Sequence, residues 1–121
     1  MGASTPRQYG SYFTFDEAQE YIPPSAEQIT ELLNNTTSVW TTLNGYNGRK
    51  FTGSNGESVF LPAAGYWNFK YGEFNGAGSW GYYWSSTPYD EDFGYELCFY
   101  SGSARRRSYS RYLGRSVRPV R

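Results

Sequence analysis

The 121-residue sequence contains no histidine and one cysteine, and these shortages exclude several kinds of chemistry. Without histidine, a protein lacks the commonest general base and every serine–histidine or cysteine–histidine nucleophile pair. A single thiolate cannot build a cysteine- and histidine-ligated zinc or iron–sulfur site, and Cys98 has no partner for an internal disulfide. We therefore expect no metal and no cofactor. Paired carboxylates remain as the only groups for an enzyme.

The sequence also lacks a long apolar run. No segment approaches the roughly 18 to 20 apolar residues that span a bilayer, and the first residues do not resemble a signal peptide. We expect no membrane insertion. The length is that of one domain with one core, so residues 1–121 are assigned to a single domain. Residues 1–12 are expected to be frayed or to be an artificial start, from which an upstream leader or domain has been removed.

Large flat side chains and permissive backbone are both abundant. Aromatic residues make up 21% of the chain, including 13 tyrosines, and there are 14 glycines. This mixture favours short strands and tight turns over a helical bundle. The formal net charge is zero, but residues 105–121 hold seven arginines and no acid, whereas residues 1–104 carry four basic and eleven acidic groups. The C-terminal end is therefore strongly basic.

Two helix starts can be predicted near the N-terminus. Thr14 and Glu17 have the spacing of a capping box, in which each side chain binds the backbone amide of the other residue. The helix that starts there should end before Pro23, because residues that precede proline avoid the helical region. Ser25 and Gln28 form a second such pair, which predicts a second helix with its apolar stripe in the core.

Short antiparallel strands are predicted after these helices. Residues 39–43 read as a strand that ends in a hairpin turn at Asn44-Gly45, and Asn47-Gly48 has the composition of a second turn. Residues 58–62 form another predicted strand. Residues 63–79 combine glycines with aromatic residues, and we expect a long loop that its rings hold in place. Trp67-Asn68 resembles half of a lectin calcium motif, but no aspartate follows, so no calcium site is expected.

Residues 93–100 alternate in a way that predicts a strand with its odd-numbered residues in the core. If Ser101-Gly102 is a two-residue turn, the following strand pairs residue by residue with this one. The pairs on the even-numbered face are Tyr100 with Ser103, Cys98 with Arg105, and Glu96 with Arg107. We expect these six to be exposed, although a lone strand cysteine is more often a small buried side chain. A one-residue slip or a bulge is the alternative, because this register places Arg106 opposite Leu97.

The C-terminal third carries motifs that resemble a known family. GYYWSST at residues 81–87, Leu97 and Phe99, and GRSVRPV at residues 114–120 resemble the Fibrobacter succinogenes major paralogous domain, a bacterial branch of the C-type-lectin-like fold. The two predicted helices resemble those of formylglycine-generating-enzyme-like proteins, although the turn at residues 22–27 lacks their arginine and tryptophan. The resemblance implies an α+β, C-type-lectin-like fold with two short helices packed on a small twisted antiparallel sheet and long loops rich in aromatic residues and glycine.

The resemblance does not imply catalysis. Oxidase members of the wider group work through cysteine thiols, and Cys98 has no partner for that role. The same fold occurs in the variable proteins of diversity-generating retroelements, in which adenine-directed mutation converts Asn codons to Tyr, Ser, Asp, Gly, Arg, Phe, Cys or Ala. Residues 89–112 fit that set well, although Glu91 and Glu96 do not. Such a protein is expected on a bacterial cell surface or a phage particle.

We therefore predict a non-enzymatic, receptor- or adhesin-type domain that binds a protein or glycan on another cell or particle. Tyrosine offers a stiff amphipathic contact, and serine and glycine offer adaptable polar ones. The candidate contact residues are Tyr89, Asp90, Asp92, Glu96, Tyr100, Ser103, Arg105, Arg107, Tyr109, Arg111 and Tyr112. Alternatives are a polyanion-binding module that uses the arginine-rich end, a structural repeat of a surface protein, and a glycan-cleaving enzyme that uses Asp90 and Asp92.

Overall fold

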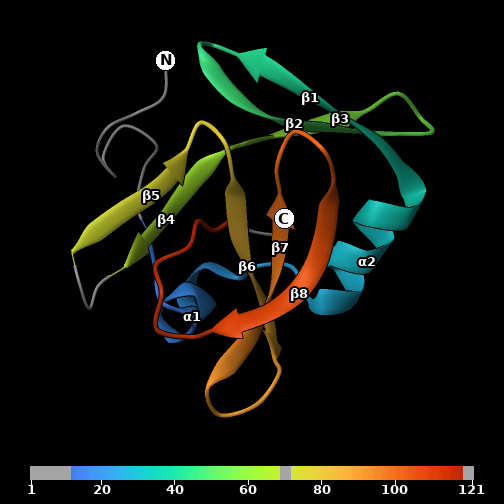
Figure 1. Ribbon diagram of the computed structural model, residues 1–121. Coiled ribbons are helices and arrows are strands. Elements are labelled where there is room, and N and C mark those ends of the chain that lie inside the picture. The colour runs from blue at the N-terminus through green and yellow to red at the C-terminus, as the bar shows by residue number, and fades with distance from the viewer. Residues whose placement is uncertain (1–11, 69–71, 119–121) are drawn as a thin grey trace.

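The computed structural model describes residues 12–68 and 72–118 (Figure 1). Strands predominate in this part of the chain, and the helices are short. The elements are α1 (Phe15–Ala18), the 3-10 turn η2 (Gln19–Tyr21), α2 (Ala26–Asn35), β1 (Thr36–Leu43), β2 (Tyr46–Gly53), β3 (Ser58–Pro62), β4 (Ala64–Asn68), β5 (Glu73–Ala77), β6 (Gly81–Pro88), β7 (Phe93–Phe99) and β8 (Ala104–Ser110).

The strands form three antiparallel sheets, ordered β1-β2-β3, β4-β5 and β6-β7-β8. Helix α2 packs against the β6-β7-β8 sheet, whereas α1 contacts β6 and the β4-β5 hairpin lies on the side of this sheet away from α2 (Figure 1). The main core cluster joins α2 to two sheets through Ile29, Phe51, Leu61, Ala63, Tyr83, Leu97 and Phe99. The β6-β7-β8 sheet is thus the common support for the rest of the described chain.

Both predicted capping boxes are confirmed. The Thr14 amide donates to the Glu17 carboxylate at 2.9 Å, and the Glu17 amide donates to the Thr14 hydroxyl at 3.3 Å. Ser25 and Gln28 make the same reciprocal pair at 2.8 and 3.1 Å. These bonds satisfy amides that have no partner within the helix, so each helix begins where the sequence predicts.

The predicted α+β class with a C-type-lectin-like fold is wrong, because the described chain is mostly antiparallel sheet. Much of the predicted 63–79 loop is the β4-β5 hairpin. Asn47-Gly48 is not a turn but part of β2. At Gly48, a side-chain Cβ would lie 2.3 Å from the Leu61 carbonyl oxygen, so the glycine permits close strand packing rather than chain reversal. At this position the glycine therefore reflects a crowded strand pair rather than a turn.

A closing segment, residues 111–117, brings the C-terminal end of the described chain back to its start. Phe13 and Arg115 exchange backbone hydrogen bonds at 2.8 Å each, and Ser116 bridges to Tyr83 in a parallel sense. The Trp84 indole donates to the Phe13 carbonyl at 2.8 Å. Consequently, the β6 face that points away from α2 is buried under both ends of the described chain.

Gly94 marks the tightest contact between this face and α1. A Cβ added at Gly94 would lie 2.2 Å from the Phe15 ring, which itself packs edge-on against Trp84. We predict that Gly94→Ala lowers the free energy of unfolding by about 1 to 3 kcal/mol, because a buried aromatic ring must shift. Urea denaturation would measure this loss. In a Phe15→Leu background the same substitution should cost less, and an equal cost in both backgrounds would contradict the proposed contact.

Candidate functional site

The predicted hairpin register is confirmed. The Tyr100 amide donates to the Ser103 carbonyl at 3.0 Å across the Ser101-Gly102 turn. Cys98 pairs with Arg105 and Glu96 with Arg107, as expected. One face of the hairpin therefore presents Tyr100, Ser103, Arg105, Arg107 and Tyr109, which are five of the predicted contact residues.

The expected exposure of Glu96 on this face is wrong, and Cys98 is buried, as a lone strand cysteine more often is. Their exposed fractions are 0% and 1%. The closing segment places Arg115 over the middle of the face, and the Tyr82 ring lies beside it. Alternation along β7 identifies which residues share a face, but it contains no information about a distant segment that covers that face.

A buried ion triad occupies the centre of this face. The Arg107 Nε donates to Glu96 Oε2 at 2.6 Å, and the Arg115 Nε donates to Glu96 Oε1 at 2.7 Å. Burial alone lowers the pKa of the Arg107 guanidinium, but the hydrogen bond and charge of Glu96 outweigh it and raise that pKa. Glu96 is therefore a structural counterion rather than a contact residue.

One carboxylate leaves part of the charge of two guanidinium groups uncompensated, and aromatic rings surround the deeper one. The Arg115 guanidinium carbon lies 4.4 Å from the Tyr82 ring centre, 4.9 Å from Tyr66 and 5.0 Å from Tyr109. The electron-rich faces of aromatic rings attract cations in this way. The side chain is held on several sides, with Glu96 as its only carboxylate partner among the described residues.

The rings continue outwards as a row across the sheet. Arg107 lies 4.3 Å from the Tyr109 ring centre, Trp80 stacks on Tyr82, and Tyr100 packs on Trp80 at 4.7 Å. Tyr100 and Tyr109 are each 39% exposed, and Arg105 is exposed. We name the residues that reach the surface here the aromatic–arginine face: Trp80, Tyr100, Ser103, Arg105, Arg107 and Tyr109. The sequence did not identify Trp80 as part of this face. It also did not identify Tyr82 and Arg115 as the buried residues beneath the face.

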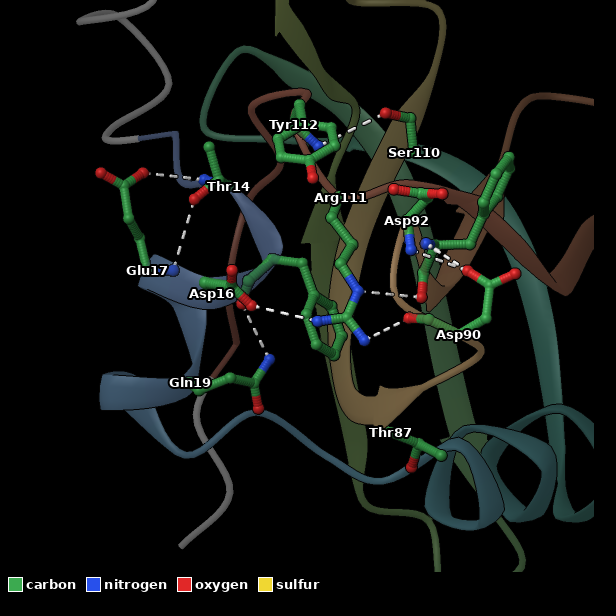
Figure 2. Close-up of polar contacts among 12 residues, drawn as sticks. Thr14, Asp16, Glu17, Gln19, Thr87, Asp90, Asp92, Ser110, Arg111 and Tyr112 are labelled. Atoms are coloured by element: carbon green, nitrogen blue, oxygen red, sulfur yellow. Dashed lines mark hydrogen bonds and ion pairs between the residues drawn. The ribbon is translucent and has the colours of Figure 1, made fainter.

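Other predicted residues lie at the opposite end of the sheet, in and near the β6-β7 loop. Figure 2 shows that Arg111 makes several of the polar contacts in this region. It donates to the Asp16 carboxylate at 3.2 Å, to the Phe93 carbonyl at 3.2 Å and to the Asp90 carbonyl. The Asp90 carboxylate in turn accepts the amides of Asp92 and Phe93, both at 2.8 Å. Arg111 and Asp90 thus hold the loop in place.

Two exposed tyrosines lie at this end, and one of them belongs to a second aromatic group. Tyr89 is 57% exposed and Tyr112 is 63% exposed. The Tyr89 ring contacts Phe93 and Tyr95, and Arg106 lies 4.8 Å from the Tyr95 ring centre. The odd-numbered face of β7 is therefore core at Leu97 and Phe99, as predicted, but not at Phe93, which is 38% exposed.

The ion pairs bear on the polyanion alternative. Of the arginines between residues 105 and 118, Arg107 and Arg115 bind Glu96, and Arg111 binds Asp16. Arg121 lies outside the described residues. Half of the described arginines in this basic end thus bind a carboxylate, whereas Arg105, Arg106 and Arg118 form no ion pair with a described residue.

The remaining chemistry of the described chain is sparse. Burial raises the pKa of the Cys98 thiol, as expected for a packed side chain rather than a reactive one. No group of three or more acidic or cysteine side chains in residues 12–68 and 72–118 is arranged to hold a metal ion. A cavity of about 230 Å³ opens on the α2 side, but core residues such as Ile29, Leu61 and Leu97 line it, away from the predicted contact residues. None of the helices in this part of the chain is long and apolar enough to cross a membrane.

Comparison with known families gave one match. The model of DUF8237, a domain of unknown function, matches residues 38–120. The chain belongs to this family. The DUF8237 match begins within β1 and extends beyond β8 and the closing segment, so it includes the ion triad and the aromatic–arginine face. Neither the curated proteins nor the solved structures gave a match.

Replacement of Glu96 tests the ion triad. We predict that Glu96→Gln lowers the free energy of unfolding by about 3 to 5 kcal/mol, because it leaves the buried Arg115 charge without a counterion. The matched control is Asp16→Asn, which breaks an ion pair whose carboxylate is 76% exposed and should cost about 1 kcal/mol or less. Denaturant unfolding of both variants measures the difference. Similar losses in the two variants would contradict the structural role of Glu96.

The stability of the protein at alkaline pH tests the burial of Tyr82 beneath the aromatic–arginine face. Burial, with a further effect of Cys98, raises the pKa of Tyr82 to about 12. The unfolded chain loses this proton near pH 10, so stability falls as pH rises from about 10 to 12, where the folded chain still retains it. We predict that Tyr82→Phe reduces the slope of this loss in urea unfolding at pH 9, 10 and 11. Parallel stability curves for the two proteins would show that Tyr82 does not contribute.

Proposed function

We propose that this domain binds a ligand without catalysis and that the aromatic–arginine face is its contact surface. The supporting observation is that Tyr100, Arg105 and Tyr109 are exposed, while the ion triad around Glu96 fixes the residues beneath them. A side chain that is already ordered loses less entropy on binding. The face therefore combines exposure with a fixed geometry.

The residue types on this face are those that carry binding energy in protein interfaces. Tyrosine, tryptophan and arginine dominate the small set of residues whose truncation weakens complexes most. On this face the Tyr109 ring has Arg107 4.3 Å from its centre and is still 39% exposed, and Tyr100 rests on Trp80 in a similar way. Each tyrosine can thus present a large contact area without rearrangement, which favours a protein ligand.

The arrangement of acidic groups supports a binding role over hydrolysis. A glycosidase needs two carboxylates on either side of the scissile bond. Here the Asp90 carboxylate binds two backbone amides of its own loop, and the only acid on the central strand, Glu96, is buried between arginines. Glu96 is therefore closed to a sugar, and the Asp90 carboxylate uses its Oδ1 oxygen to order its own loop.

The retroelement hypothesis agrees with this division of residues. Tyr100, Ser103, Arg105 and Tyr109 are exposed and belong to the set that Asn codons reach by adenine mutation. Glu96 is outside that set and is buried. We propose that any diversification acts on the exposed residues around a constant ion triad, in a domain that bacteria or phages display on their surface.

Paired tyrosine replacements test the contact surface. Ligands would first be selected from a peptide display library and a glycan array with the full chain. We predict that Tyr100→Ser with Tyr109→Ser weakens their binding at least tenfold in surface plasmon resonance. The control replaces Tyr46, which is 38% exposed on the β1-β2 hairpin and is not part of the aromatic–arginine face, with serine and should change affinity less than twofold. Unchanged affinity in the double variant would place the contact surface elsewhere.

A further inference from the structure

Strand β8 forms one edge of its sheet. In the described residues it pairs only with β7. The Tyr100 amide donates to the Ser103 carbonyl, and the Arg111 amide donates to the Asp92 carbonyl. These two bonds show which residues of β8 direct their backbone groups towards β7. In an antiparallel pair, every second residue turns its backbone groups towards the partner, so Arg105, Arg107 and Tyr109 bond to β7. The N–H and C=O groups of Ala104, Arg106 and Ser108 consequently point away from the sheet.

These outward groups form a short row of donors and acceptors. Throughout residues 12–68 and 72–118, no backbone hydrogen bond joins Ala104, Arg106 or Ser108 to a segment beyond β7. An unpaired edge of this kind is a template for a further strand, and many domains bind extended peptides there. The backbone geometry therefore allows strand addition along residues 104–108.

The side chains that flank this edge are basic. Arg105 is exposed and makes no ion pair with a described residue. Arg106 donates to the Thr30 hydroxyl at 3.0 Å and to the Ala26 carbonyl at 3.4 Å, neither of which neutralises its charge. Residues 104–110 contain no acid. An added strand would therefore meet positive charge on both faces.

This charge selects among possible partners. If two copies of the domain joined by their β8 edges in antiparallel fashion about Arg107, the two Arg107 side chains would face each other. Like charges directly opposite each other destabilise a strand pair, so in this register the arginines oppose self-association. They favour a strand that carries carboxylates, and long-range attraction would speed its encounter with the edge.

We propose that β8 binds an extended acidic segment of another protein by strand addition, with carboxylates beside Arg105. This inference rests on the proposed binding function and names its ligand class, because the added strand would lie next to Tyr109 on the aromatic–arginine face. Backbone bonds to residues 104–108 supply general affinity, and the arginines and tyrosines select the sequence.

The experiment uses a blocked seven-residue peptide of alternating glutamate and valine, titrated into the full chain and followed by isothermal calorimetry. Two further peptides carry N-methyl groups either on all glutamate amides or on all valine amides. Only one of these sets faces β8 in a given strand orientation, although the side chains and charge are the same in both peptides. We expect saturable binding of the parent peptide, and at least tenfold weaker binding for one methylated isomer only.

Protein variants provide a second readout. Ser108→Pro removes an outward N–H without breaking the β7 ladder, and proline is tolerated on edge strands. It should weaken peptide binding at least tenfold, whereas Ser108→Ala, which keeps the N–H, should bind like the parent protein. If Ser108→Pro does not fold, the two methylated peptides decide the question with the unaltered protein. A lysine–valine peptide should not bind.

Two results would overturn the inference. One is the absence of peptide binding at millimolar concentration, and the other is equal binding of both methylated isomers, which indicates attraction by charge alone. Neither result affects the test of Tyr100 and Tyr109, which uses independently selected ligands. Conversely, if those tyrosines prove irrelevant while the methylated isomers differ, the edge binds peptides and the proposed face is wrong.

Discussion

A single carboxylate, that of Glu96, holds together the parts of this protein that lie on one face of the central sheet. Its two oxygens bind guanidinium groups from β8 and from the closing segment, so one side chain of β7 fixes both neighbours. Arginine suits this position better than lysine, because its flat guanidinium can bind a carboxylate while rings contact its surfaces. The rings of Tyr66, Tyr82 and Tyr109 provide those contacts around Arg115. Loss of the carboxylate would affect strand, segment and rings together.

The central sheet is covered differently on its two sides, and this difference determines where a ligand can bind. On one side α2 and β3 bury Leu97 and Phe99 in an apolar core. On the other side the cover consists of Arg115 and aromatic rings, and it leaves the outer parts of Tyr100 and Tyr109 exposed. Residues of the proposed contact surface therefore stand on regular strands rather than on long loops. Their geometry is set by the same contacts that stabilise the domain.

Local patterns in the sequence predicted local structure well. The capping boxes at Thr14 and Ser25, the Ser101-Gly102 turn and the pairing of Glu96 with Arg107 all depend on residues close in sequence, and all are present. The burial of Glu96 depends on Arg115, which arrives from another part of the chain, and no pattern within β7 reports its arrival. Sequence alone therefore identified the right hairpin and most of its exposed residues, but it did not reveal that Glu96 is covered.

The wrong loop prediction for residues 63–79 has a related cause. Glycine and aromatic residues in 63–79 predicted a loop, because glycine is common in turns. In the structure, Gly65 allows β4 and β5 to approach so closely that a Cβ would lie 2.2 Å from the Asn75 carbonyl oxygen. The sequence correctly indicated that glycine gives the backbone conformational freedom. It did not indicate that a neighbouring strand lies too close to Gly65 for a side chain. Of the predicted contact residues, Tyr100, Ser103, Arg105, Arg107 and Tyr109 share one face, whereas Arg111 and Asp90 maintain a loop.

The hydrogen bonds between Phe13 and Arg115 have a consequence for how the protein is made. During synthesis the ribosome releases Phe13 long before Arg115, so the β6 face with Trp84 and Tyr82 stays uncovered until the closing segment emerges. Contacts between residues so distant in sequence also form slowly in free folding. Until then, Glu96 lacks one of its cations and an apolar surface faces the cytosol or a chaperone. Nascent chains of this family are therefore expected to be most prone to aggregation just before the closing segment leaves the ribosome.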